Sequence, residues 1–237
     1  MTRARSEPVT LEVPGSSVPV TAVHTPPVPQ SGSPGIQVVF LLGHGIANDR
    51  ESPLLVGYLE GLALHGVRGL RFNFPFKERK EPAPDPRDLL FATLDSVIGW
   101  ARGRFGPEAL LVLGGKSLSA RVSASHQARF GRAQAMAYLG YPLHPPDDRG
   151  KLRGEDLQKI PVPQYLAVGD LDPFCDLDLL SPIREAIQAP FHLEVIEGGD
   201  HGLGVDEGAD PERAAAVLDR LVSTTRVWID AQLRPGP

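Results

Sequence analysis

A serine at the end of a predicted strand is the first candidate for chemistry. Ser117 lies in the run Gly114-Gly115-Lys116-Ser117-Leu118-Ser119, which matches the nucleophile-elbow pattern G-x-S-x-G with Ser119 in place of the last glycine. In such an elbow the chain turns so sharply from strand to helix that only small residues fit on either side of the serine. The turn exposes the hydroxyl as a nucleophile and directs the next backbone N–H, here that of Leu118, at the reacting carbonyl.

Two other interpretations of this run compete with the elbow. A glycine-rich turn between a strand and a helix needs no catalytic role. A phosphate-binding loop would also contain Gly115-Lys116-Ser117, but it needs a glycine five residues before Gly115, where Leu110 stands. The sequence therefore disfavours the phosphate-binding loop and leaves the ordinary turn as the alternative.

A carboxylate and a histidine follow two later predicted strands. The loop after residues 164–168 contains Asp170 and Asp172, and Asp172 is the better candidate for orienting a histidine because it lies beyond the strand end. The loop after residues 191–196 contains His201 between glycines, a placement that favours proton transfer over core packing. Taken singly, turn aspartates and a surface histidine would explain the same residues.

The order of the three candidates strengthens the hypothesis. Ser117, Asp172 and His201 occur in the order nucleophile, acid, histidine, each after its own predicted strand, and this is the order of α/β-hydrolases. An earlier loop, residues 43–46, follows the first buried strand. Such a loop commonly supplies a second oxyanion donor, so we expect the backbone N–H of Ile46 to serve with that of the elbow.

Alternating strands and helices must position these loops. Continuous apolar runs predict strands, and apolar residues at helical spacing predict helices. The predicted strands are residues 37–42, 67–72, 109–113, 134–139, 164–168 and 191–196, and the predicted helices begin at or near Ser52, Asp85, Leu118, Leu179 and Asp210. This alternation predicts an α/β fold with a mostly parallel sheet, helices on both faces, and functional loops at the carboxyl ends of the strands.

We expect a single domain over residues 1–237. Residues 1–35 are rich in proline, serine and glycine, and two short alternating runs at 10–13 and 18–23 predict an antiparallel hairpin whose prolines keep both strands at the edge of the sheet. Residues 36–237 are predicted to form the core. The predicted loop Gly140–Ile160 is too short for a helical cap, so we expect no large cap domain and an open or shallow site.

Composition argues against several classes of protein. The chain has 237 residues, 41% hydrophobic and 22% charged, which is enough for a sizeable core. The single cysteine, Cys175, excludes a disulfide framework, and no histidine pair has metal-ligand spacing, so we expect neither a metal nor a cofactor. A formal net charge of −5 argues against a nucleic-acid or anionic-membrane partner.

Without a recognisable signal or spanning segment, the expected location is the cytoplasm, and the excess of arginine over lysine suggests a bacterial source. The sequence leaves the oligomeric state open.

Five short motifs together resemble one branch of the α/β-hydrolase superfamily. They are His44-Gly45, Arg71-Phe72-Asn73-Phe74-Pro75, Gly114-Gly115-Lys116-Ser117, Gly140-Tyr141-Pro142-Leu143-His144-Pro145-Pro146 and Gly198-Gly199-Asp200-His201. The branch contains bacterial dienelactone-hydrolase-like proteins and animal relatives of the testis-expressed hydrolase-like type, and the similarity covers about residues 36 to 230. The resemblance implies the α/β-hydrolase fold, a Ser117–Asp172–His201 triad and the oxyanion donors, but it supplies no substrate.

Two positions depart from the pattern of this branch. Relatives usually have glycine where Ser119 stands, so the packing behind the nucleophile is expected to be slightly looser. Genuine dienelactone hydrolases use a cysteine nucleophile, whereas position 117 is serine and Cys175 lies in another loop. We therefore do not expect dienelactone hydrolase activity.

The sequence predicts a serine hydrolase that cleaves a small-molecule ester or thioester through an acyl-enzyme, although a peptidase would present the same triad. The candidate pocket residues are His44, Phe76, Tyr141, His144 and Phe174, of which His44 also suits a structural hydrogen bond and the aromatic residues also suit loop packing. The alternative is a catalytically inactive α/β-hydrolase fold that serves as a binding or scaffold protein. The glycine missing at Ser119 supports that alternative.

Overall fold

The computed structural model describes residues 6–29, 37–206 and 208–233. The described strands are β1 (Glu7–Leu11), β2 (Val20–Thr25), β3 (Val38–Gly43), β4 (Arg68–Phe72), β5 (Leu110–Lys116), β6 (Ala135–Leu139), β7 (Gln164–Gly169) and β8 (Phe191–Ile196). The described helices are α1 (Pro53–Ala63), α2 (Pro75–Glu78), α3 (Arg87–Phe105), α4 (Leu118–Phe130), α5 (Glu155–Lys159), α6 (Leu177–Glu185) and α7 (Pro211–Gln232).

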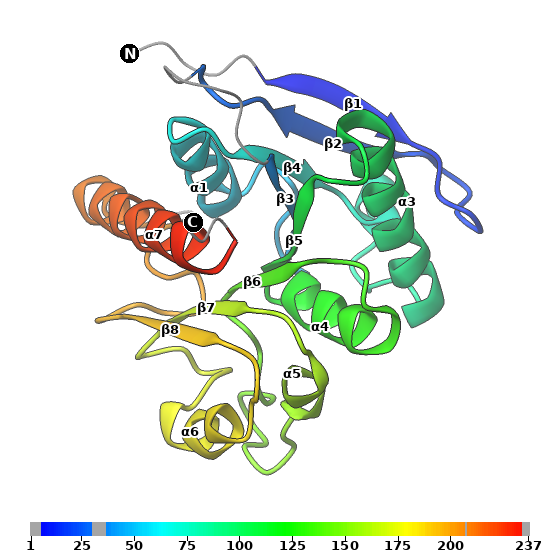
Figure 1. Cartoon of the computed structure of the whole chain (residues 1–237). Helices are drawn as coiled ribbons and strands as arrows, with labels where there is room; N and C mark the ends of the chain where they lie inside the picture. The colour runs from blue at the N-terminus through cyan, green and yellow to red at the C-terminus, as the bar shows by residue number, and fades with distance from the viewer. Residues whose placement is uncertain (1–5, 30–36, 207, 234–237) are drawn as a thin grey trace.

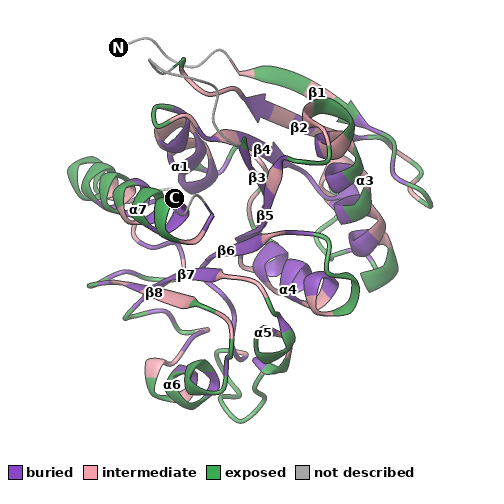
Figure 2. Cartoon of the chain, viewed as in Figure 1, coloured by how far each residue is buried: buried purple, intermediate pink, exposed green. Residues whose placement is uncertain are grey.

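The strands form one sheet in the order β1-β2-β4-β3-β5-β6-β7-β8. Strands β3 to β8 pair in parallel, whereas β2 pairs antiparallel with both β1 and β4. Every residue of β3, β6 and β7 is buried, as expected for parallel strands covered on both faces (Figure 2). The carboxyl ends of the parallel strands therefore meet along one edge of the sheet, where the candidate loops begin.

Two hydrophobic cores lie on opposite faces of the sheet. Helices α1 and α7 cover one face, and α3, α4, α5 and α6 lie on the other side (Figure 1). Alternate residues of β3 contribute to different cores: Val39 and Leu41 pack with the α3 and α4 side, and Phe40 and Leu42 with α1 and α7. The central strands thus hold both layers together.

The predicted α/β-hydrolase architecture is confirmed, with two helices that the sequence analysis did not predict. Helix α2 follows β4, and α5 lies within the segment Gly140–Ile160, for which the expectation of a loop without a helix is wrong. Each helix has five residues or fewer, which is too short to give a helical repeat of apolar residues. No cap domain covers the sheet edge in the part of the chain that the structure describes.

The N-terminal hairpin lies at the edge of the sheet, but its strands are displaced from the predicted runs at 10–13 and 18–23. The expectation that both strands are edge strands is wrong for β2, because Ala22 pairs with Phe72 of β4. Pro8 lies in the outermost strand and Pro19 immediately before β2, so no proline removes a hydrogen-bond donor within β2. Residues 1–5 and 30–35 of the predicted hairpin segment lie outside the described residues.

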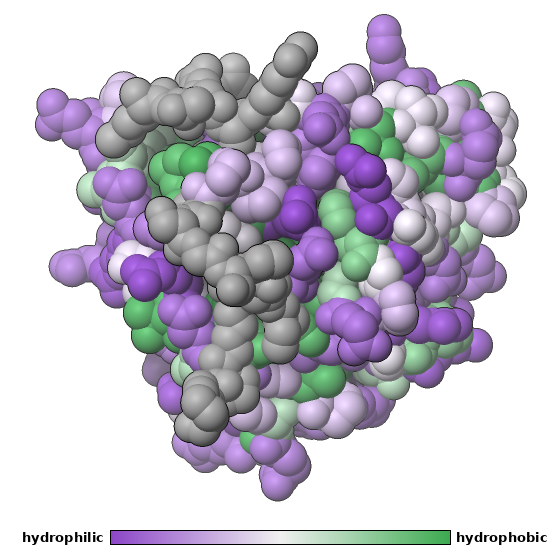
Figure 3. All heavy atoms as spheres, turned by 45° about the horizontal axis from the view of Figure 1, so that its top comes forward, coloured by the Kyte–Doolittle hydropathy of each residue, from purple (hydrophilic) through white to green (hydrophobic). Residues whose placement is uncertain are grey.

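None of the described helices combines the length and the hydrophobicity that crossing a bilayer requires. On the face seen in Figure 3, hydrophobic side chains form small separate areas among hydrophilic ones.

Candidate active site

Ser117 occupies a strained turn between β5 and α4. Its backbone has φ +52° and ψ −109°, a combination that a residue with a Cβ rarely adopts. The Ser117 N–H donates to the carbonyls of Leu139 (3.3 Å) and Gly140 (3.2 Å), which fixes the turn against the end of β6. Gly115, with φ +131°, allows the close passage of β3, because a Cβ there would overlap the backbone of Gly43. The strand-turn-helix context expected of a nucleophile elbow is therefore present.

Ser119 fills the space behind this turn. Its side chain is fully buried, its hydroxyl donates to the carbonyl of Gly114 (2.8 Å), and a Cβ on Gly43 would overlap its oxygen. Glycines at 43 and 115, on the two neighbouring strands, accommodate the hydroxyl.

The structure brings Ser117, His201 and Asp172 into hydrogen-bond contact. His201 Nε2 lies 2.8 Å from Ser117 Oγ, and His201 Nδ1 lies 2.8 Å and 3.0 Å from the two carboxylate oxygens of Asp172. The Asp172 side chain is fully buried, whereas the imidazole is 20% exposed. Gly140 makes room for this loop, because a Cβ there would lie 2.8 Å from the His201 carbonyl oxygen.

Asp170, the competing carboxylate, is exposed and forms no described contact with a histidine. Its backbone N–H donates to Ile196, which holds the end of β7 against β8. Among the two aspartates of this loop, only Asp172 contacts His201.

Ile46 and Leu118 line one cavity, and their backbone N–H groups donate to no acceptor among the described residues. The loop that carries Ile46 passes close to the nucleophile, because a Cβ on Gly45 would lie 3.2 Å from Ser117 Cβ. Two free N–H donors beside a serine hydroxyl suit the stabilisation of a developing oxyanion.

His44 shapes this loop from the interior. Its Nδ1–H donates to the carbonyl of Gly45 (2.7 Å), and its Nε2 accepts the N–H of Phe74 (3.0 Å). Burial lowers the pKa of His44 to about 4, so the ring is neutral at pH 7. His44 is a buried hydrogen-bonding residue and does not reach Ser117.

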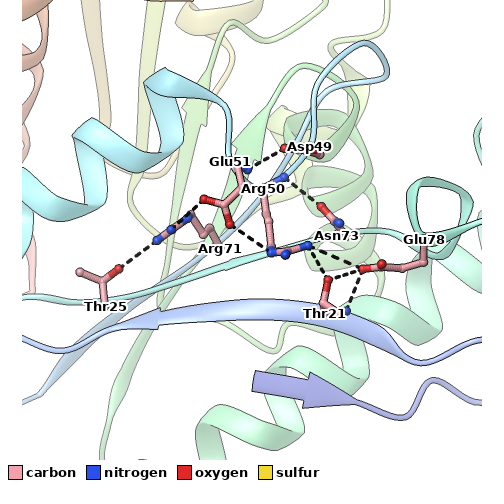
Figure 4. Close-up of polar contacts among 8 residues, drawn as sticks. All are labelled: Thr21, Thr25, Asp49, Arg50, Glu51, Arg71, Asn73 and Glu78. Atoms are coloured by element: carbon pink, nitrogen blue, oxygen red, sulfur yellow. Dashed lines mark hydrogen bonds and ion pairs between the residues drawn. The ribbon is translucent and has the colours of Figure 1, made fainter. Parts of the chain in front are cut away.

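The chain that follows the oxyanion loop is tied to β2 and β4 by a polar network (Figure 4). The Arg50 N–H donates to Asn73 Oδ1 (2.9 Å), and the Arg50 guanidinium contacts the hydroxyl of Thr21. Glu51 accepts from the Arg71 guanidinium at 3.0 Å. The hairpin strand β2 therefore helps to hold the segment that carries Ile46.

Lys116 joins three loops of the site. Its side chain is 5% exposed, and its ammonium pairs with the carboxylate of Asp206 and lies 3.4 Å from Asn48 Oδ1. Asp206 also accepts from Ser52 Oγ (3.2 Å) at the start of α1. Burial lowers the pKa of Lys116 to about 8, whereas the nearby carboxylates of Asp200 and Asp172 act in the opposite direction. Lys116 thus links the elbow, the oxyanion loop and the loop that carries His201.

The predicted pocket residues lie in different places. Tyr141 lines a cavity of about 580 Å³ next to Ile46 and Leu118, whereas His144 lines a second cavity, of about 470 Å³, beside Asp172. The Phe174 ring lies 4.5 Å from the His201 ring between centroids. His44 and Phe76 are fully buried against Phe74 and line neither cavity.

Sequence reasoning missed two arginines, Arg121 and Arg153, in the cavity next to the oxyanion donors. One signal was available for the first of them, because Arg121 follows Ser117 by one helical turn. For Arg153, in a segment without periodic pattern, the sequence gives no signal.

A metal or a thiol nucleophile finds no support among the described residues. They contain no group of three or more histidine, cysteine, aspartate or glutamate side chains suited to hold a metal ion. Cys175 is buried, and burial raises the pKa of its thiol to about 12. Such a thiol is protonated at neutral pH and is a poor nucleophile.

Comparison with known proteins shows the family and the fold of this chain. The model of a family described as "alpha/beta hydrolase domain" matches residues 36–230. Similar solved structures include a serine hydrolase without a lid from Xanthomonas campestris, with 19% identity over 100% of this chain and 99% of that chain and a TM-score of 0.70. A dienelactone hydrolase from Anabaena variabilis has 18% identity over 98% of this chain and 99% of that chain, with a TM-score of 0.70. An alpha-beta serine hydrolase homologue from Coxiella burnetii has 16% identity over 92% of this chain and 96% of that chain, with a TM-score of 0.70. The structural likeness shows a shared fold, and because the family model spans most of the sequence, this chain belongs to the alpha/beta hydrolase family.

Proposed function

We propose that this protein is a serine hydrolase that cleaves a small ester or thioester through an acyl-enzyme on Ser117. The observation that supports the proposal most is the continuous chain of contacts from Ser117 Oγ through the His201 imidazole to the buried carboxylate of Asp172, with both contacts at 2.8 Å. This is the arrangement by which a histidine removes the proton of a serine hydroxyl.

In the first half of the proposed reaction, Ser117 Oγ attacks the acyl carbon while His201 Nε2 takes the hydroxyl proton. Asp172 fixes the ring with Nδ1–H toward the carboxylate and stabilises the imidazolium that forms. The N–H groups of Ile46 and Leu118 donate to the oxyanion. When the tetrahedral intermediate collapses, the proton on Nε2 passes to the leaving alcohol or thiol, and the acyl group stays on Ser117.

In the second half, water replaces the leaving group. His201 Nε2 takes a proton from the water, whose oxygen attacks the acyl carbon, and then returns this proton to Ser117 Oγ as the carboxylic acid leaves. The same imidazole therefore acts as base and acid in each half of the cycle, which requires that it remain reachable by water; the 20% exposure of the ring supports this.

A small substrate is favoured by the size of the adjoining cavity. About 580 Å³ is in the usual range for a small-molecule site, and Ile46, which lines the cavity, is 46% exposed. The proposal of a small ester or thioester, rather than a protein substrate, rests on this volume.

Activity-based labelling tests the proposal. The wild-type protein should react with a fluorophosphonate probe, and peptide mass analysis should find the label on Ser117. Ser117→Ala should abolish labelling, and His201→Ala should slow it by about three orders of magnitude or more, because the base that activates the hydroxyl is lost. Ser181→Ala is the matched control, since Ser181 is exposed in α6, and it should label like the wild type.

The scaffold alternative makes the opposite prediction. If the folded wild-type protein does not label at Ser117 and cleaves none of a panel of esters and thioesters of graded chain length, the hydrolase proposal is wrong. A cytoplasmic location remains a prediction from the sequence alone.

A further inference from the structure

Two arginine side chains line the cavity beside the oxyanion donors without forming an ion pair with any described carboxylate. Arg121 lies in the first turn of α4, and Arg153 lies just before α5. Within the described part of the chain, no carboxylate oxygen lies within 4.0 Å of either guanidinium, and neither guanidinium donates a described hydrogen bond. Both side chains are half-buried, so a bound anion would supply the partner that they lack among the described residues.

Arg121 and Arg153 line the same cavity, and the charge of one acts on the other. Burial lowers the pKa of Arg121, and the charge of Arg153 lowers it further. Both cations also lower the pKa of Tyr141, against the larger effect of burial, and the Tyr141 hydroxyl donates to the Arg153 carbonyl at 2.7 Å. Arg121 and Arg153 therefore form a cationic pair next to Tyr141.

The remaining charges of the cavity leave this pair with one net positive charge. Three of the other charged residues have partners outside the pair: Asp85 with Arg79 at 2.5 Å, Arg87 with Asp88 at 3.9 Å, and Glu155 with Lys159 at 3.8 Å. Asp156 lines the cavity too and raises the pKa of Arg121 by its charge, but it does not come within 4.0 Å of either guanidinium. Two cations facing one carboxylate suit a ligand with a single negative charge.

An apolar wall belongs to the same cavity as Ile46, Leu118 and the cationic pair. Leu90, Phe91 and Val122 line the cavity together with Leu118 and Arg121. Along α4 the backbone rises about 1.5 Å per residue, so Arg121 lies about 5 Å beyond Leu118 along the helix axis. An acyl group whose carbonyl meets the oxyanion donors would pack its methylene groups on this wall and direct its far end toward the two arginines.

We propose that Arg121 and Arg153 bind a carboxylate at the far end of the acyl chain, so that the preferred substrate is a half-ester or half-thioester of a short dicarboxylic acid. This inference rests on the proposed hydrolase function. A guanidinium is suited to the planar carboxylate because it donates two parallel hydrogen bonds. A carboxylate carries one negative charge, which balances the net charge of Arg121, Arg153 and Asp156. A phosphate dianion would bring one negative charge more than this group can balance.

A pair of matched esters tests the substrate class. Mono-4-nitrophenyl adipate carries the terminal carboxylate, and 4-nitrophenyl hexanoate has the same chain length without it. The wild type should prefer the adipate ester in kcat/KM. Arg121→Gln and Arg153→Gln should each lower kcat/KM for the adipate ester by about ten- to a hundredfold, mainly through KM, and change that for hexanoate by less than about twofold.

Two further variants control for charge and for folding. Arg121→Lys retains the charge but not the paired donors, so its loss should be intermediate. Arg129→Gln removes an exposed arginine at the end of the same helix and should leave the preference of the wild type unchanged. If the wild type labels at Ser117 and cleaves both esters equally, or if the arginine variants slow both esters alike, the carboxylate site is refuted and the hydrolase function stands.

A binding measurement separates the carboxylate site from catalysis. Ser117→Ala protein, titrated calorimetrically with monomethyl adipate, should bind it at least about tenfold more tightly than the double variant Ser117→Ala/Arg121→Gln. If these two proteins differ in affinity as expected, but the wild type neither labels at Ser117 nor cleaves either ester, the carboxylate site is supported and the hydrolase proposal is wrong. Equal or undetectable binding by both proteins would overturn the carboxylate site.

Discussion

His44 supports the oxyanion loop only while its ring is neutral. Its Nδ1–H donates to Gly45, and its Nε2 accepts from the Phe74 N–H. A proton on Nε2 would place two donors face to face in a site that excludes water, since the side chain has no exposed surface. The loop that carries Ile46 is therefore coupled to the protonation state of a residue that has no part in the proposed proton transfers.

We predict that this histidine makes the fold less stable in mild acid. Its pKa is about 4 in the folded protein and about 6.5 in the unfolded chain, so the unfolded chain binds the proton first as the pH falls. The contribution of His44 is complete above about pH 6.5 and is lost progressively toward pH 4, by about 3 kcal/mol at most. Urea unfolding of the wild type and of His44→Gln at pH 7.5, 6 and 5 measures it.

The difference between the two proteins isolates His44. Burial also lowers the pKa of His24 and of His126, but both residues are present in the wild type and in the variant. His65→Gln, at an exposed position, should retain the pH dependence of the wild type. If His44→Gln lost as much stability as the wild type between pH 7.5 and 5, His44 would not be the coupling group.

At the scale of elements, the elbow depends on how closely β3, β5 and α4 approach one another. Gly43 and Gly115 allow β3 and β5 to approach, Gly114 allows β5 to approach β6, and Ser119 fills the remaining space. We predict that Ser119→Ala costs only about 1 kcal/mol of unfolding free energy, because Ser123 Oγ also donates to the Gly114 carbonyl (3.3 Å). Ser119→Val adds atoms where there is no space and should cost about 1–3 kcal/mol more.

The same pair of variants should separate packing from chemistry. Ser119→Val displaces the first turn of α4 and with it the Leu118 N–H, so fluorophosphonate labelling of Ser117 should slow by about tenfold or more. Ser119→Ala should label at nearly the wild-type rate. Chemical denaturation and labelling kinetics on both variants provide the measurements, and equal stability of the two would contradict the close packing at this crossing.

Most of the elements could be predicted because their residues are buried on both faces. The run Val38–Gly43 has no polar side chain, so strand is the only conformation that suits its length and its flanking loops. The five-residue helix α5 could not be predicted, since Leu157 is its only buried residue and gives no repeat. The displaced hairpin strands have another cause: the register of a short strand depends on its partner, which for β2 is β4.

Some residues of the candidate site could likewise be predicted from the sequence, and others could not. Ser117, Asp172 and His201 could be selected because each follows a buried strand, and the carboxyl ends of parallel strands meet at one edge. The partner of Lys116 could not be chosen from sequence, because Asp206 is one of several carboxylates in that loop and only the fold brings it to β5. The cationic pair could not be predicted either, since Arg121 and Arg153 are far apart in sequence and line one cavity only in the folded chain, where α4 packs against α5.

At the scale of the whole molecule, the sheet makes two cores interdependent. Trp100 on α3 packs against the core on one face, beside His24 of β2 (5.6 Å between ring centroids), and Trp228 on α7 is buried in the core on the other face. Since the residues of β3 alternate between these cores, neither core can lose its packing without disturbing the strand that supports the other. We therefore propose that the hairpin and both cores unfold together, as one cooperative unit.

The two tryptophans of the chain allow a direct test of this cooperativity. Trp228→Phe leaves Trp100 to report on the hairpin and the α3 face, and Trp100→Phe leaves Trp228 to report on the α7 face. In each variant the urea midpoint by fluorescence should coincide with the midpoint by far-ultraviolet circular dichroism, even though the substitutions themselves shift stability. A Trp100 transition well below the circular-dichroism midpoint would mean that the hairpin unfolds separately. Because β2 holds the Arg50 segment through Thr21, such a protein would also lose Ser117 labelling at the lower midpoint. If fluorescence and circular dichroism give the same urea midpoint in each variant, the oxyanion loop keeps its conformation only as long as the entire sheet stays folded.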